Sequence, residues 1–188
     1  MEATKCMLVL AVAFCAMAGA NSKPKKRVKT YPIKDLTDIE ERLYIKWRNY
    51  NETENLCYSA TKKSGSDKHF VYTLRVWPYD WEHLLLYDTK MTTEATTGHT
   101  VHNAARYKFG PGYPDVLREL VFANNAKNCF ILRENLTDNQ PGCQLVRTDS
   151  TIDKRVPVNC KRAYEKHCPG EKIELYEYYC PDIPDKVR

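Results

Sequence analysis

Hydrophobic and polar residues alternate through much of the chain, in short runs separated by turn-forming residues. The clearest case is the segment 128–147, in which two apolar runs, each opened by a cysteine, flank a polar stretch with proline and glycine. This arrangement is typical of a β-hairpin. Runs rich in β-branched and aromatic residues predict further strands at 42–50, 55–62, 69–77, 81–93, 99–110 and 117–126. Short strands at this spacing predict a mostly β protein, built as an antiparallel barrel or sandwich.

A different periodicity marks the start of this region. Between Ile33 and Trp47, apolar residues recur at steps of three and four, which predicts a short amphipathic helix. From residue 42 onward alternation fits better, so we expect the helix to end near Glu41 and the first strand to begin there.

The pattern changes again near the C-terminus. The segment 156–168 opens with a proline suited to a helix start and places Cys160, Tyr164 and Cys168 at four-residue steps. This spacing predicts a helix with all three side chains on one buried face. Residues 173–180 then have the pattern of an extended segment.

The first twenty residues predict export. They contain an apolar run from Met7 to Met17, followed by the small residues Ala18 and Ala20, which is the pattern of a cleaved secretory signal peptide. Nothing later in the chain is apolar over the roughly 18 residues that a membrane span requires. We therefore expect a secreted, extracellular protein without a membrane span.

Length and charge fit a single exported domain. About 168 residues would remain after cleavage, which suits one domain with a core. We expect a signal peptide over 1–20, a basic flexible tail over 21–31, and one domain over 32–188. Much of the net charge of +5 lies in residues 23–29, which is typical of a solvated tail; the alternative is weak attachment to an anionic polysaccharide or surface. We expect no nucleic-acid partner.

Cysteines and glycosylation sequons both fit an oxidising compartment. Of eight cysteines, Cys6 and Cys15 would leave with the signal peptide, and the even number that remains predicts three disulfides rather than metal ligation. Spacing alone does not choose among the possible pairings. The sequons at Asn51 and Asn135 predict N-glycosylation at the protein surface.

The residues do not indicate an enzyme. The five histidines are scattered, and the closest pair, His99 and His102, would point to opposite faces of a strand and could not share a metal ion. Catalytic motifs such as GxSxG or HExxH are missing from the sequence, and an even cysteine count leaves no spare thiol. We expect neither a catalytic site nor a metal or cofactor.

Taken together, these features resemble the tick salivary lipocalins of the histamine-binding type. The resemblance covers the expected mature chain, and its strongest part is the order of cysteines from Cys129 to Cys180. It implies an eight-stranded antiparallel barrel with an internal ligand cavity, closed by helices. It also implies the disulfides Cys57–Cys180, Cys129–Cys160 and Cys143–Cys168. We expect a monomer that sequesters a small host mediator and thereby suppresses inflammatory defence.

The predicted hairpin carries the first candidate ligand-binding residues. If Cys129 and Cys143 point outward to the helix, alternation directs four side chains into the cavity: Phe130, Leu132, Gln144 and Val146. Amine-binding members of the family carry Asp, Glu and Trp where this chain has Phe130, Gln144 and Val146. A buried ammonium without a paired charge costs several kcal/mol, so this subsite favours an apolar guest over histamine. An amine site elsewhere could use Glu82, Glu94 or Glu119.

The segment 69–77 offers two orientations. If Arg75 and Trp77 face inward, Arg75 could bind the carboxylate of a fatty acid or eicosanoid. If Tyr72 and its neighbours face inward instead, they pack the barrel and Arg75 lies outside. The sequence leaves both orientations open, and with them the choice between a biogenic amine and a lipid.

A protein-binding inhibitor of a host immune or haemostatic protein is the alternative function. The thirteen tyrosines are many for this length, and exposed tyrosines make good contact anchors. The segments 110–115 and 173–180 are the candidate contact regions.

Overall fold

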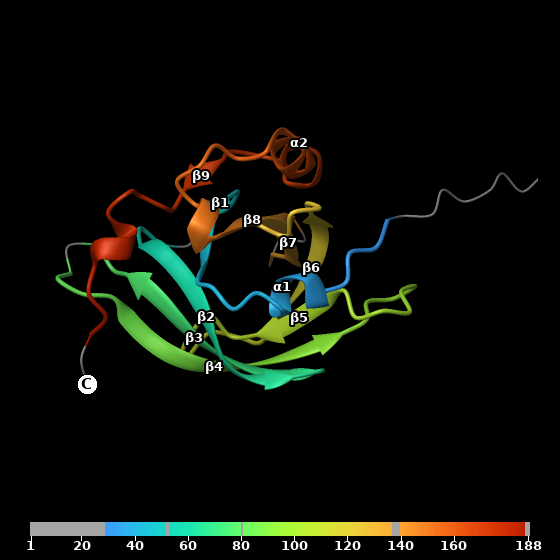
Figure 1. Ribbon diagram of the computed structural model, residues 1–188, viewed down its shortest axis with the longest axis horizontal. Helices are drawn as coiled ribbons and strands as arrows, with labels where there is room; N and C mark the ends of the chain where they lie inside the picture. The colour runs from blue at the N-terminus through green and yellow to red at the C-terminus, as the bar shows by residue number, and fades with distance from the viewer. Residues whose placement is uncertain (1–28, 52, 80, 137–139, 187–188) are drawn as a thin grey trace, which may run out of the picture.

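The computed structural model describes residues 29–51, 53–79, 81–136 and 140–186, so the predicted signal peptide and most of the predicted tail lie outside the described residues. Eight antiparallel strands follow one another around a barrel (Figure 1). Strand β1 pairs with both β2 and β8 and closes the barrel. The prediction of an eight-stranded antiparallel barrel is therefore confirmed. No helix in the described part of the chain is long and apolar enough to cross a membrane.

The barrel strands are β1 (Leu43–Arg48), β2 (Leu56–Ser66), β3 (His69–Trp77), β4 (Leu85–Glu94), β5 (Ala104–Tyr107), β6 (Val116–Ala123), β7 (Cys129–Asn135) and β8 (Pro141–Thr148). The remaining elements are the helices α1 (Lys34–Thr37) and α2 (Val158–His167), the strand β9 (Ile173–Glu174), and the 3-10 turns η1 (Asp149–Thr151) and η2 (Cys180–Asp182).

Alternation along the strands divides the core into an inside and an outside. Leu74 of β3, Leu132 of β7 and Val146 of β8 pack together inside the barrel. Cys143 and Leu145, which lie between interior residues of β8, pack outside the barrel against α2. Because α2 covers the outer face of β7 and β8, these two strands are buried on both faces, which explains their nearly continuous burial.

The N-terminal helix is shorter than predicted, ending at Thr37 rather than near Glu41. Ile33 and Leu36 bury their side chains in the barrel interior, as a helical face requires. The later apolar positions, Leu43 and Trp47, belong to β1 and point to opposite sides of the barrel wall. The three- and four-residue spacing therefore combined residues of two different elements.

Two other predicted strands are also shorter than expected. Strand β4 begins at Leu85 instead of residue 81, and β5 contains only Ala104–Tyr107 of the predicted 99–110. Ahead of β5, the Asn103 side chain accepts a hydrogen bond from the backbone N–H of Thr96 at 2.9 Å. Such side-chain bonds to backbone stabilise a loop in competition with a strand ladder.

Helix α2 lies outside the barrel, beside β7 and β8 (Figure 1). Its predicted buried face is present: Cys160 and Tyr164 are buried, as is Cys168 at its C-terminal end. Disulfides Cys129–Cys160 and Cys143–Cys168 join it to β7 and β8, and Cys57–Cys180 joins the C-terminal segment to β2. These are the three pairs that the family resemblance implied.

The segment predicted to be extended over 173–180 is so only at Ile173–Glu174. The chain then turns, because Leu175 accepts a backbone hydrogen bond from Cys57 at 2.8 Å and Cys180 is bonded to the same cysteine.

The turn between β2 and β3 depends on Gly65. Its φ is +109°, and a Cβ at this position would lie 2.3 Å from the carbonyl oxygen of His69. Only glycine fits both the left-handed backbone and this close approach.

Candidate ligand-binding site

The barrel interior contains two adjoining cavities, the inner chamber and the outer chamber. The inner chamber, about 60 Å³, is mainly apolar, and its lining includes Leu36 of α1 and Ile33, the residue before this helix. The outer chamber, about 220 Å³, extends to Pro111 and Tyr113 in the loop between β5 and β6. Residues that line both chambers are Ile45, Tyr58, Tyr87, Phe109 and Gln144.

The charged residues that line the two chambers are all basic. Among the described residues, neither chamber is lined by an aspartate or a glutamate. The outer chamber has one charged lining residue, Arg48, and the inner chamber is bordered by Arg75. The described linings therefore contain no acidic side chain that could pair with a cation.

The structure places the four hairpin candidates on the interior face. Leu132, Gln144 and Val146 line the inner chamber. Phe130 packs with Leu132 and Val146 inside the barrel but does not border the chamber. Phe130 therefore supports the cavity wall, whereas the other three can contact a guest.

Strand β3 adopts the second of its two predicted orientations. Tyr72 and Leu74 line the inner chamber. The Arg75 side chain turns away, and its Nε donates to the two carboxylate oxygens of Asp185 at 3.0 and 3.1 Å. Trp77 packs outside, with its ring 5.8 Å from that of Tyr179. The Arg75 guanidinium is therefore engaged by the Asp185 side chain, although Arg75 still borders the inner chamber. A role of Arg75 and Trp77 in ligand binding stays a prediction.

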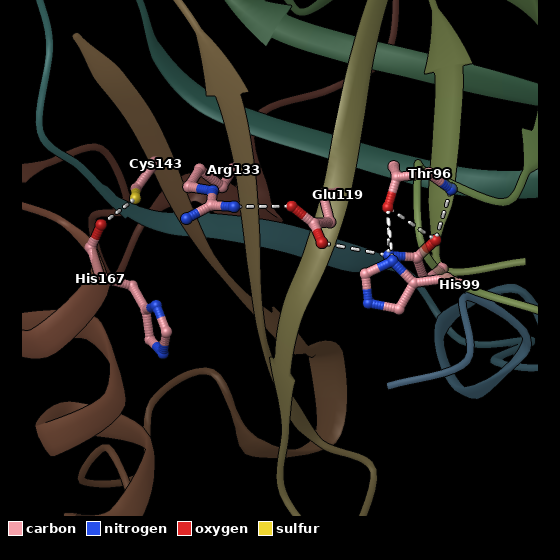
Figure 2. A network of polar contacts seen from close by, with 7 residues as sticks. Thr96, His99, Glu119, Arg133, Cys143 and His167 are labelled. Atoms are coloured by element: carbon pink, nitrogen blue, oxygen red, sulfur yellow. Dashed lines mark hydrogen bonds and ion pairs between the residues drawn. The ribbon is translucent and has the colours of Figure 1, made fainter. Parts of the chain in front are cut away.

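The three glutamates considered for a separate amine site do not reach the cavity. Glu82 is exposed in the loop before β4. Glu94 pairs with Arg106 at 2.7 Å, and Glu119 pairs with Arg133 at 2.7 Å. Figure 2 shows Glu119 directed toward Arg133 on the neighbouring strand. Because all three lie outside the chamber linings, none forms an amine site there.

A buried polar cluster lies beside the chambers, on the interior of β6, β7 and β8. The carboxylate of Glu134 pairs with Nη2 of Arg118 at 2.9 Å. Its other oxygen accepts hydrogen bonds from the Tyr50 hydroxyl at 2.5 Å and from Nε2 of Gln144 at 3.2 Å. All four side chains are at least about nine-tenths buried. Sequence analysis missed Glu134 and Arg118, although Glu134 follows Phe130 and Leu132 at two-residue steps and alternation alone could have found it.

Aromatic rings complete the surroundings of Arg118. Its guanidinium carbon lies 4.1 Å from the ring centre of Phe109 and 4.4 Å from that of Tyr107. Two aromatic rings and a carboxylate are the groups that bind organic cations in proteins. In this protein the Arg118 guanidinium already takes the place of such a cation between these groups.

The environment keeps these groups in defined protonation states. Burial opposes the charge of Arg118, but Tyr107 and Glu134 hold the pKa of the guanidinium above its ordinary value. Burial, together with the nearby Glu134 carboxylate, raises the pKa of Tyr50. Arg118 therefore remains a cation, and Tyr50 remains a protonated donor to Glu134.

Two buried side chains that line the inner chamber carry polar atoms without a hydrogen-bond partner among the described residues. They are Gln144, through its Oε1, and Tyr72, through its hydroxyl. Burial of an unpaired polar atom is costly. A mainly apolar guest with a hydroxyl or similar group would satisfy them.

An up-and-down barrel of eight strands around an internal cavity defines a small-molecule-binding protein of the lipocalin class. The sequence agrees with this class, since residues 23–184 match the family described as tick histamine binding protein. The chain therefore belongs to the tick histamine-binding protein family, which is a family of binding proteins and not of enzymes.

Several solved structures share the fold at low sequence identity. Japanin from Rhipicephalus appendiculatus, bound to cholesterol, is 16% identical with a TM-score of 0.53, covering 74% of this chain and 95% of its own. AM182 in complex with serotonin is 12% identical with a TM-score of 0.63, covering 83% and 96%. Insecticyanin from Manduca sexta is 12% identical with a TM-score of 0.59, covering 84% and 88%. No curated protein sequence matches the chain.

Proposed function

We propose that this protein is secreted and sequesters a small, largely apolar host mediator inside its barrel, thereby weakening inflammatory defence. The absence of any carboxylate from the chamber linings of the described residues supports an apolar guest. Binding alone would suffice, because a captured mediator is removed from its receptor by mass action.

Secretion is supported by independent features. The N-terminal sequence has the pattern of a signal peptide, and three disulfides are typical of an oxidising compartment. The predicted glycosylation sites Asn51 and Asn135 are both exposed.

A biogenic amine is the alternative guest by family membership. Serotonin and cholesterol in the two similar structures illustrate an amine and an apolar ligand in this fold. In this chain the buried carboxylate of Glu134 is already neutralised by Arg118. An amine would have to displace that guanidinium or lose its hydration without a counter-ion, and either costs several kcal/mol. The apolar ligand is therefore favoured.

The neutral fluorescent probe N-phenyl-1-naphthylamine should bind inside the barrel and brighten. We expect Ala105→Phe to abolish this signal, because Ala105 is buried in the wall of the inner chamber and a larger ring would fill the space. Thr92→Phe adds the same ring at an exposed position of β4 and should leave binding unchanged. Fluorescence titration, with circular dichroism to verify folding, measures both.

Ala60→Leu provides a milder version of the same test if Ala105→Phe does not fold. Ala60 also lines the inner chamber. A probe that binds the wild type and both chamber variants equally, or that does not bind at all, would contradict an internal apolar site.

One surface observation favours the alternative of a protein-binding inhibitor. Tyr178, Tyr79 and Trp81 are 81%, 60% and 46% exposed. A series of ring contacts through Tyr179 and Trp77 connects Tyr178 to Tyr79. This aromatic patch includes Tyr178 and Tyr179 of segment 173–180, where protein contacts were predicted, whereas Tyr176 of the same segment is buried. A pure protein binder would not respond to the probe, so the same titration separates the two functions.

A further inference from the structure

We propose that Arg48 is the anchor of the outer chamber for a carboxylate, and that the ligand is therefore a monocarboxylic acid with an apolar tail. This inference rests on the proposed function, since it specifies the chemical class of the sequestered molecule. Arg48 is the last residue of β1, is only 4% exposed, and lines the outer chamber.

Among the residues that the structure describes, Arg48 has only neutral partners. Its Nη2 donates to Oδ1 of Asn51 at 3.2 Å and to the backbone oxygen of Thr53 at 2.8 Å. Both acceptors are neutral, and no carboxylate among the described residues forms an ion pair with Arg48. Its Nε is buried and has no hydrogen-bond partner in the described part of the chain. A guanidinium in this state can still receive an anion.

The surroundings select the kind of anion. Buried ions are normally paired, and a guanidinium binds a carboxylate through a planar pair of hydrogen bonds. Rings of Tyr50 and Tyr58 flank the Arg48 guanidinium at 5.4 and 5.6 Å. They restrict the space to a small planar head group and provide apolar walls beyond it.

The path from Arg48 into the barrel suits an apolar tail. Tyr58, Tyr87 and Phe109 line both chambers, so a chain held at Arg48 can pass along these rings into the inner chamber. The inner chamber is lined by aliphatic and aromatic side chains and by no carboxylate among the described residues. The head and tail of a fatty-acid-like molecule therefore each meet matching chemistry.

Other arginines do not offer the same site. Arg75 is paired with Asp185, and Arg118 with Glu134. Arg147 is buried, but it donates to the backbone oxygens of Asn128 and Thr151 and lines neither chamber. Arg48 alone combines burial, an unpaired charge and a place in a chamber wall among the described residues.

Dodecanoic acid and dodecan-1-ol test the inference, because they share a tail and differ in the head group. Affinities are measured at neutral pH by displacement of N-phenyl-1-naphthylamine and by calorimetry on the mature, disulfide-intact protein. We expect the wild type to bind the acid about 10- to 100-fold more tightly than the alcohol, the range of a charge-assisted hydrogen bond. In Arg48→Met this preference should disappear while alcohol affinity stays within about twofold.

Two further variants sharpen the result. Arg48→Lys keeps the charge but loses the planar pair of donors, so it should retain part of the preference. Arg133→Met removes an arginine from the outer face, where it pairs with Glu119, and should retain all of it. If Arg48→Met does not fold, the wild-type comparison and Arg48→Lys still decide.

The outcomes separate this inference from the proposed function. If the wild type binds the probe but binds the acid and the alcohol with equal affinity, Arg48 does not anchor a carboxylate, although the cavity still binds apolar molecules. A preference that persists in Arg48→Met would also overturn it. Failure of probe, acid and alcohol to bind would reject the proposed function and the anchor together.

Discussion

Arg118→Met should lower the free energy of unfolding by about 3–5 kcal/mol, the range for breaking a buried ion pair from one side. The substitution leaves the Glu134 carboxylate buried and without the guanidinium that lies 2.9 Å away in the wild type. It also removes the donor to the Tyr107 backbone oxygen at 3.1 Å. Urea denaturation at neutral pH measures the loss.

The double variant Arg118→Met/Glu134→Gln is the matched control. This variant has no unpaired charge, and the amide oxygen introduced at position 134 can still accept the hydrogen bond from the Tyr50 hydroxyl. It should therefore recover most of the lost stability. A loss below about 1 kcal/mol for Arg118→Met alone, in the range of exposed ion pairs, would contradict a buried, tightly coupled pair.

The same residue explains why the native barrel should not bind an amine at Glu134. In Arg118→Ala the carboxylate and the Tyr107 and Phe109 rings would remain around a vacated space. Methylguanidinium should therefore raise the melting temperature of Arg118→Ala and leave that of the wild type unchanged. Equal effects on both proteins would show that Arg118 does not occupy a cation site.

Loss of the Cys57–Cys180 disulfide should have an effect of similar size. In the chain-entropy model, a loop closed over a sequence separation of 123 residues corresponds to roughly 5 kcal/mol. The double substitution to alanine would also remove the covalent link between the C-terminal segment and β2. Tyr176 of this segment packs against Tyr44 in the same buried cluster as the disulfide.

Chemical denaturation of Cys57→Ala/Cys180→Ala, with the other disulfides intact, provides the measurement. Cys143→Ala/Cys168→Ala is the comparison, because its separation of 25 residues corresponds to only about 3.5 kcal/mol. A larger loss for this shorter loop would contradict the assigned role of the C-terminal bond.

The parts of the fold that the sequence predicted well depend on local patterns. Two apolar runs around a turn were enough for the β7–β8 hairpin, and four-residue steps placed Cys160 and Tyr164 on the buried face of α2. The same two-residue alternation, anchored by the outward cysteines, gave the interior positions of Leu132 and Val146.

The site was harder to predict because its contacts are distant in sequence. Both faces of β3 carry apolar residues, and the Arg75 guanidinium is engaged by Asp185, 110 residues away. The partners of Glu134 come from β6, β8 and the segment after β1. Arg48 lies at the end of β1, where helical and strand patterns overlap, so its direction could not be assigned from periodicity.

Calorimetric titration of the mature, disulfide-intact protein with histamine tests most directly whether the chamber is apolar or built for a cation. With Glu134 paired to Arg118 and no carboxylate among the described lining residues, we predict no heat of binding for histamine while the neutral apolar probe binds in a parallel titration. Submicromolar binding of histamine would contradict this account and show that the barrel retains an amine site.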